Sequence, residues 1–164
     1  MGYAQLSEGR VQKLNVIDEI NRAIEEVFPA KVATTTRIHR EFAVALPPLL
    51  MQQKHLDEAV SNLLQNARDA AGEQGHIRVT ARCLHDDSVE IAVQDDGPGI
   101  PPDKLERVFE AYYTTKQRGS GLGLAVVKHN AELYGGRVRV ESELGKGAKF
   151  PLISPPKALM PPSS

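Results

Sequence analysis

The chain has 164 residues, 41% of them apolar, which is enough for one globular domain with a buried core. Its 20 Lys and Arg nearly balance its 21 Asp and Glu, which argues against a strongly charged nucleic-acid-binding or membrane-binding surface. The single cysteine, Cys83, excludes an intrachain disulfide and argues against a zinc site; its strand-like surroundings predict a buried, inert thiol. Because the sequence has no membrane-spanning apolar run and no signal-peptide pattern, we expect a cytoplasmic location, which is compatible with a membrane anchor elsewhere in a longer protein.

The N-terminal part of the chain predicts a polar lead-in followed by one helix. Residues 1–13 are polar with few periodic apolar positions, so we expect a linker or a frayed helix there. From Leu14 to Val27 apolar residues recur at helical spacing, and Pro29 marks the end of that helix. Asn15 and Asp18 are both candidates for its N-cap, since each carries a side-chain acceptor for backbone N–H groups.

A second helix, over residues 53–71, is predicted after a β-like stretch at 32–42 and the break at Pro47-Pro48. Asn62 and Asn66 are four residues apart in that helix and therefore share one face. Asparagine is disfavoured inside helices because its amide competes with the backbone. Taken alone, the pair is best explained as surface amides, and a ligand site is the alternative.

Alternating apolar residues predict a β-sheet in the rest of the chain. Strands are expected at residues 77–83, 89–93, 138–140 and 148–153, with helices at 103–109 and 122–133. Pro151 interrupts the last strand, which an edge position in the sheet would explain. Together the elements predict an α/β (α+β) two-layer sandwich, in which a mixed β-sheet packs on helices.

Two glycine-rich loops flank the middle of this region. The first is Asp95-Asp96-Gly97-Pro98-Gly99-Ile100, and the second is Gly119-Ser120-Gly121-Leu122-Gly123-Leu124. The second loop runs into a predicted helix, whose N-terminus would present N–H groups to an anion. Neither loop fits a Walker or dinucleotide fingerprint, and either one alone is most simply a turn. With the asparagine pair upstream, they favour a nucleotide site.

In combination these motifs resemble the N, G1, F and G2 boxes of sensor histidine kinases. The matching stretches, in the family's order and spacing, are Asn62-x-x-x-Asn66-Ala, Asp95-x-Gly97-x-Gly99-Ile, Phe109 with Tyr112-Tyr113, and Gly119-x-Gly121-x-Gly123. The wider superfamily includes the ATPase domains of DNA gyrase B, Hsp90 and MutL. The resemblance covers roughly residues 30–153 and implies a Bergerat-type fold that binds ATP and Mg²⁺ between the helical layer and a lid.

The resemblance also implies a role for each matching residue. Asn66 would ligate Mg²⁺, and Asn62 would orient the triphosphate or a metal-bound water. Asp95 would read the adenine amine, because a carboxylate only accepts hydrogen bonds; a plain turn residue is its alternative. The base and the phosphates would be lined by Gly97, Gly99, Ile100, Phe109, Tyr113, Gly119, Ser120, Gly121, Leu122, Gly123 and Leu124.

One position departs from the pattern of many relatives, which carry Lys or Arg three residues after the second asparagine. Asp69 stands there in this chain, and Arg68 and Lys116 are the candidates for the missing phosphate contact. Lys116 lies in the lid between the glycine loops, where a flexible ammonium would act as a point charge beside phosphates. A solvated loop lysine is equally compatible with the sequence.

The phosphoacceptor of a histidine kinase is typically a histidine followed by an acidic residue on a dimeric helical hairpin. Only His85 precedes an acidic residue, and it lies in a predicted hairpin loop with no proline following. None of the histidines therefore fits the whole pattern: His39, His55, His76, His85 and His129. We therefore expect the ATP-binding catalytic domain of a two-component sensor histidine kinase. It would transfer the γ-phosphate to a histidine on a dimerisation domain not present in this chain, which then signals to a response regulator.

On this interpretation, residues 1–29 lead from the missing hairpin, 30–153 form the catalytic domain and 154–164 form a disordered tail. We expect no nucleic-acid partner and no membrane segment in the chain itself. Two alternatives remain: a free-standing protein serine kinase of the anti-sigma type, and a non-catalytic nucleotide-gated binding module. The sequences of the lid and the second glycine loop are closer to those of histidine kinases than to those of anti-sigma-type kinases.

Overall fold

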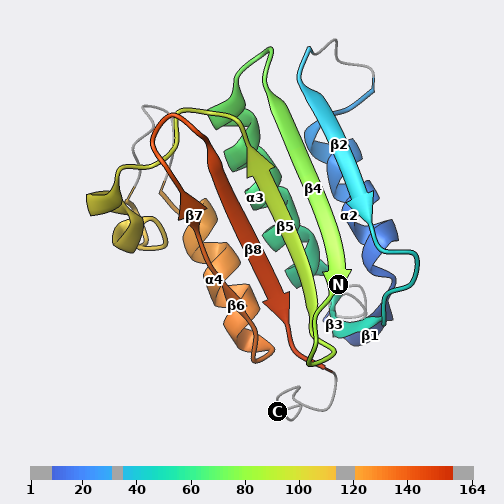
Figure 1. The fold of residues 1–164 in the computed structure, drawn as a ribbon. Helices are drawn as coiled ribbons and strands as arrows, with labels where there is room; N and C mark the ends of the chain where they lie inside the picture. The colour runs from blue at the N-terminus through green and yellow to red at the C-terminus, as the bar shows by residue number, and fades with distance from the viewer. Residues whose placement is uncertain (1–8, 31–34, 114–120, 157–164) are drawn as a thin grey trace, which may run out of the picture.

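A computed structural model describes residues 9–30, 35–113 and 121–156, and it shows a layer of helices on one face of a β-sheet (Figure 1). In chain order the elements are β1 (Val11–Leu14), α2 (Val16–Val27), β2 (Arg37–Phe42), β3 (Leu49–Gln52), α3 (Gln53–Ala71), β4 (His76–Cys83), β5 (Val89–Asp95), the 3-10 helix η1 (Pro102–Arg107), α4 (Gly123–Leu133), β6 (Arg137–Val138), β7 (Glu141–Ser142) and β8 (Ala148–Ser154). The predicted two-layer α/β sandwich is confirmed. None of the helices in these described ranges is long and apolar enough to cross a membrane.

The main sheet has the strand order β2-β4-β5-β8-β6, and β7 also pairs with β8. β2 and β4 are parallel, whereas the other neighbours are antiparallel, so the predicted mixed sheet is confirmed. The parallel pair requires a crossover, which β3 and α3 provide. This crossover places α3 behind the centre of the sheet.

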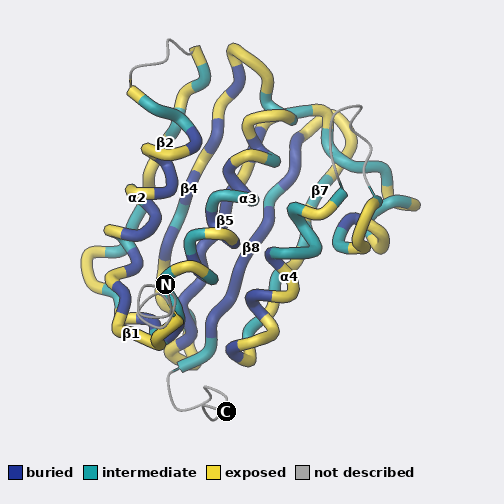
Figure 2. The backbone as a smooth tube through the Cα atoms, turned by 180° about the vertical axis from the view of Figure 1, so that it is seen from behind, coloured by how far each residue is buried: buried dark blue, intermediate teal, exposed yellow. Residues whose placement is uncertain are grey.

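The core lies between α3 and the sheet, where buried residues alternate along β4 and fill nearly every position of the central strand β5 (Figure 2). Ile77 and Val79 of β4 and Leu63 and Leu64 of α3 are all 0% exposed. Burying each such side chain contributes about 1.5–3 kcal/mol. These contacts fix α3 against the sheet. The polar face of α3, next to its buried stripe, lies toward the loop that follows β5.

The N-terminal lead-in differs from the prediction. Residues 11–14 form strand β1 instead of a linker or frayed helix, and β1 pairs antiparallel with β3, a strand that the sequence pattern does not predict. Leu14, Leu49 and Met51 are buried, so these two short strands close one end of the core. Each is too short to show a period of its own, and it is the pairing that stabilises both.

α2 begins with the cap that the sequence allowed, because the Asn15 side chain accepts the Asp18 N–H at 3.0 Å. Its apolar side belongs to the same core, with Ile20 and Ala23 fully buried. That α2 continues from a dimerisation hairpin stays a prediction.

The sequence suggested an edge position for Pro151, but the structure places it inside the sheet. It pairs with Ala92 of β5 on one side, and on the other side its carbonyl accepts the Arg139 N–H at 3.0 Å. The N–H and C=O of a strand residue point to the same side, so the missing N–H faces β6 and β7. The ladder is interrupted there between Val138 and Glu141, and this gap accommodates the proline.

Cys83 is exposed, which corrects the prediction of a buried thiol. It is the last residue of β4, and β2 pairs with β4 only as far as Ala81. Among the described residues, Cys83 therefore has no strand neighbour on that side.

The side chain of Glu26 on α2 lies next to that of Asp57 on α3, and this pair of carboxyl groups gives a pH-dependent prediction. Burial, followed by the neighbouring Asp57, raises the pKa of Glu26 above its usual 4.5. A raised acid pKa means that stability is lost as the pH rises from 4.5 through the folded-state value. We expect Glu26→Gln to unfold at higher denaturant concentration than the parent chain at pH 7, with the advantage fading below pH 4.5. Equal unfolding midpoints at pH 7 would show that the pair exerts no repulsion.

Candidate functional site

Asp95 ends β5 on the core-facing side of the sheet, and only 3% of it is exposed. Its Oδ1 accepts the Gly97 N–H at 2.8 Å, which turns the chain over the last turn of α3. A Cβ at Gly97 would lie 2.5 Å from the carbonyl oxygen of Ala70, so only glycine allows this close contact with the helix. The loop thus carries a buried carboxylate next to the helix that holds Asn62 and Asn66.

The next glycine, Gly99, packs against the turn between β7 and β8. Its φ is +80°, and a Cβ there would lie 2.3 Å from the carbonyl oxygen of Glu143. Both this glycine and Gly97 are explained by contacts with protein backbone. The expected passage of a base close to them stays a prediction.

Gly99→Ala is expected to destabilise the fold more than Gly145→Ala. Gly145 has nearly the same φ, +82°, but its Cβ would have nothing within 4 Å. The control substitution therefore costs only the left-handed backbone penalty, about 1–2 kcal/mol. Gly99→Ala adds displacement of a packed loop, about 1–3 kcal/mol more. Urea unfolding of both variants measures the difference, and equal losses would mean that the loop yields without cost.

Asn62 faces the start of α4. Asn62 donates its Nδ2 to the Glu58 carbonyl at 2.8 Å, one turn earlier in α3. A Cβ on Gly123, the first residue of α4, would lie 3.1 Å from Asn62 Oδ1. Leu122 at the N-cap has no side-chain acceptor for the first N–H groups of this helix, which suits an anionic ligand.

The two ends of the predicted lid are joined by a backbone hydrogen bond. The Tyr112 N–H donates to the Gly121 carbonyl at 2.7 Å. The predicted site residues Lys116, Gly119 and Ser120 lie outside the described residues.

The aromatic residues before the lid are attached to the body of the domain. Phe109 is partly buried and meets Phe150 of β8 edge to face, with ring centroids 6.1 Å apart. The guanidinium of Arg107 lies 4.4 Å from the centroid of the Tyr113 ring. Ile100 and Leu124 are also partly buried against the core, so the apolar side of the site is continuous with it.

Ser142 is a supporting residue that the sequence analysis missed. Its Oγ accepts the Ile100 N–H at 2.8 Å and donates to the Gly147 carbonyl at 2.7 Å. It therefore ties the first glycine loop to the turn that leads into β8. A lone serine between two predicted strands carries no local signal for this role.

Arg68 does not reach the site, which corrects its proposed phosphate contact. It donates to the Val27 carbonyl at 2.8 Å and lies over the Phe28 ring, at 5.8 Å from the ring centroid. It serves instead the C-terminal end of α2, where a cation is favourable.

A polar network joins the other ends of α3 and α4. Buried Asn130 donates to the His55 carbonyl at 3.0 Å and to Glu58 Oε1 at 3.1 Å. The Tyr134 hydroxyl accepts the Gln52 N–H at 3.1 Å and shares a hydrogen bond with His55 Nδ1 at 2.6 Å. Burial lowers the pKa of His55, which favours a neutral ring. The network sets the spacing of the two helices that meet at Asn62 and Gly123.

Residues 51–158 match the protein-family model described as histidine kinase-, DNA gyrase B-, and HSP90-like ATPase. The chain belongs to this family. Over 147 residues it is 39% identical to the sensor histidine kinase ZraS of Salmonella typhimurium, covering 88% of this chain and 31% of that protein. The chain thus spans about a third of this curated relative.

Solved structures of the family share the fold. The mycobacterial sensor histidine kinase MprB gives a TM-score of 0.78 at 27% identity, covering 88% of this chain and 97% of that one. Full-length ShkA, solved in complex with AMPPNP, gives a TM-score of 0.78 at 30% identity, covering 88% of this chain and 31% of that one. The fold of these family members therefore extends over 88% of this chain.

Proposed function

We propose that the chain binds ATP with Mg²⁺ and transfers the γ-phosphate to a histidine on a separate dimerisation domain, as the catalytic domain of a sensor histidine kinase. The observation that carries this proposal is the convergence of three motifs on α3. The Asp95 loop packs on Ala70, the asparagines lie one and two turns earlier, and the start of α4 faces Asn62.

The side chains at this convergence fit the proposed ligands. A buried carboxylate accepts from the exocyclic amine of adenine, and Asp95 stands where a strand end meets a helix. Mg²⁺ prefers hard oxygen ligands and takes few of them from the protein, which suits the side-chain oxygen of Asn66. Bound Mg²⁺ would neutralise charge on the phosphates. Asn62 and the first N–H groups of α4 would orient the phosphate chain.

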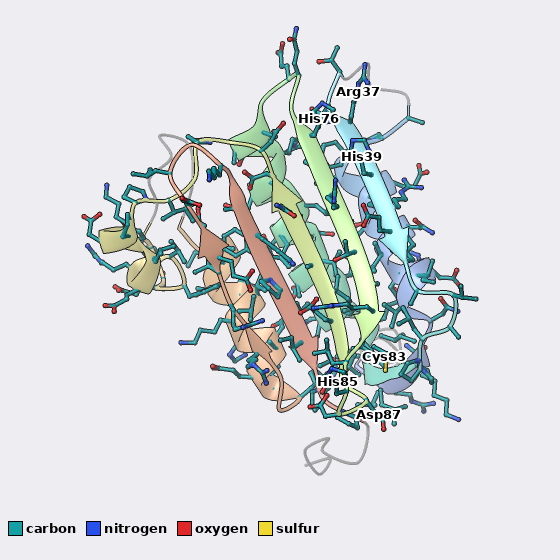
Figure 3. The ribbon with its side chains drawn as sticks, viewed as in Figure 1. Arg37, His39, His76, Cys83, His85 and Asp87 are labelled. Carbon is teal, nitrogen blue, oxygen red and sulfur yellow. The ribbon has the colours of Figure 1, made fainter. Side chains whose placement is uncertain are left out.

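The positions of His39, His55, His76 and His85 favour an acceptor on another domain. His39 and His76 form a pair with 3.0 Å between their nearest ring nitrogens, at the end of the sheet where Asp95 lies but on its opposite face, and His85 lies at the other end (Figure 3). His55 is bound to Tyr134, and it precedes Asn66 by 11 residues in α3. That separation is about 16 Å along a helix axis, beyond the reach of a bound phosphate.

The test is incubation of the whole chain with γ-labelled ATP and Mg²⁺, with and without a dimeric hairpin carrying a His-Glu motif. We expect no label on the chain alone, because orientation contributes about 7–11 kcal/mol to such reactions and no acceptor is in place. With the hairpin, acid-labile label should appear on its histidine, and a response regulator added afterwards should remove it.

Other outcomes identify the error. Acid-stable label on the added protein would favour a serine kinase. Acid-labile label on the chain alone, mapped to His55 or His129, would reveal an internal acceptor. ATP binding by calorimetry without any transfer would leave the binding module as the better description.

A further inference from the structure

No helix of the described residues covers the face of the main sheet opposite the helical layer (Figure 1). A row of small residues crosses it: Thr80 of β4 aligns with Ala92 of β5, and Ala92 aligns with Pro151 of β8. Longer side chains stand in the rows on either side, and over β2, β4 and β5 they enclose a trough of about 490 Å³, which Lys149 of β8 also lines. Ala92 is only 1% exposed although no helix covers it, because its neighbours rise around it.

The spacing of the rows on this face of the sheet matches an α-helix lying across the strands. The flanking rows, one with Arg78 and Lys149 and the other with Arg82 and Arg137, each lie two residues from the small row. Two residues span about 6.8 Å, so the flanking rows are about 14 Å apart at the backbone. A helix with its side chains is about 10–12 Å across. From β2 to β6 the sheet spans about 19 Å, the length of a helix of about 13 residues.

The charges on this face are unlike those of the whole chain. The chain has a net charge of −1, yet the open face carries six cations: Arg37, Arg78, Arg82, Arg137, Arg139 and Lys149. Glu41, Glu90 and Glu141 pair with three of them. Within the described part of the chain, Arg37, Arg137 and Lys149 make no ion pair.

Two of the ion pairs fix cations at the sides of the trough. Glu90 has only 4% of its side chain exposed and holds the Arg82 guanidinium at 2.8 Å, while the Arg82 side chain remains 61% exposed. Arg78 is held by Glu41 at 3.3 Å and is 54% exposed. Fixed guanidinium groups lose less conformational entropy when they bind carboxylates.

We propose that this trough docks an acidic amphipathic α-helix of a protein partner. The small apolar face of the helix would lie in the trough over Thr80 and over the side chains that cover Ala92. Its carboxylates would reach Lys149 on one side and, beyond the trough on β6, Arg137 on the other. The carboxylates Glu41, Glu90 and Glu141, interspersed among the cations, oppose a uniformly charged phosphodiester backbone. The trough therefore favours an acidic helix over nucleic acid.

The test uses a synthetic helical peptide of about 18 residues, with an Ala and Leu stripe flanked by Glu on both sides. It is titrated into the whole ¹⁵N-labelled chain. We expect amide shifts at Thr80, Ala92 and Gln94 and an affinity that falls as salt is raised. Shifts confined to the helical layer, or equal binding of the same peptide with Gln for Glu, would overturn the proposal.

Charge reversal separates this surface from the nucleotide site. The double variant Lys149→Glu, Arg137→Glu should weaken peptide binding by at least about tenfold, because each reversal replaces an attraction by a repulsion. Lys54→Glu on α3, an exposed lysine of the helical layer, is the matched control and should change it by less than about twofold. ATP binding should be unchanged in all variants, so failure of the docking proposal is distinguishable from failure of the proposed function. Equal losses in the double variant and the control, or tighter binding of a DNA duplex than of the acidic peptide, would contradict docking of an acidic helix.

Discussion

Replacing Asn66 by alanine is expected to reduce phosphotransfer to a supplied histidine hairpin by about 10²–10³-fold, the loss typical of a removed transition-state contact. In the proposed role Asn66 supplies the protein oxygen on Mg²⁺, and phosphoryl transfer depends on positioning and on neutralising charge. Asn66 lies on the polar face of α3, beside the buried Leu63 and Ala67, so its truncation removes no core packing.

The matched control for this change is Gln65→Ala. Gln65 is the adjacent residue of α3, carries the same amide group and is exposed. Labelled ATP and the hairpin measure the rate, and thermal unfolding confirms the fold of both variants. Full activity in Asn66→Ala, or the same loss in Gln65→Ala, would remove the metal assignment.

Asp95→Asn is expected to weaken the binding of adenine nucleotides by about 1.5–3 kcal/mol, which is about 10–150-fold in Kd. The substitution keeps the size of the side chain and an oxygen for the Gly97 N–H, which Asp95 now holds at 2.8 Å. It replaces the second acceptor by an amide donor, which opposes the donor amine of adenine.

Guanine carries a carbonyl where adenine carries that amine, so GTP binding should change less. Asp96→Asn is the control, because Asp96 is the next residue and its Oδ1 accepts the His76 N–H at 3.0 Å, further along the sheet edge. Calorimetry with ATP and GTP on both variants gives the comparison. Equal losses for the two nucleotides would make Asp95 a turn residue only.

The sequence by itself determined the helices and strands in which apolar residues recur at a regular spacing and face the core. The predicted helix 53–71 matches α3, since its apolar stripe runs for five turns and Gly72 ends it. The β4–β5 hairpin was predictable for the same reason, because alternation specifies which face is buried. The motifs around Asp95 and Asn62 were also visible in the sequence, and their order carried the family resemblance.

The tertiary structure alone decided the features that depend on what lies opposite a residue in space. Pro151 tolerates an interior strand only because β6 and β7 leave a gap beside it. Arg68 follows Asn66 by two residues in the motif, yet it turns to α2 because the Val27 carbonyl ends a helix there. Gly99 is required by a backbone oxygen 44 residues away, at Glu143. Such contacts leave no period in the sequence, because each depends on a single long-range approach and not on a repeating face.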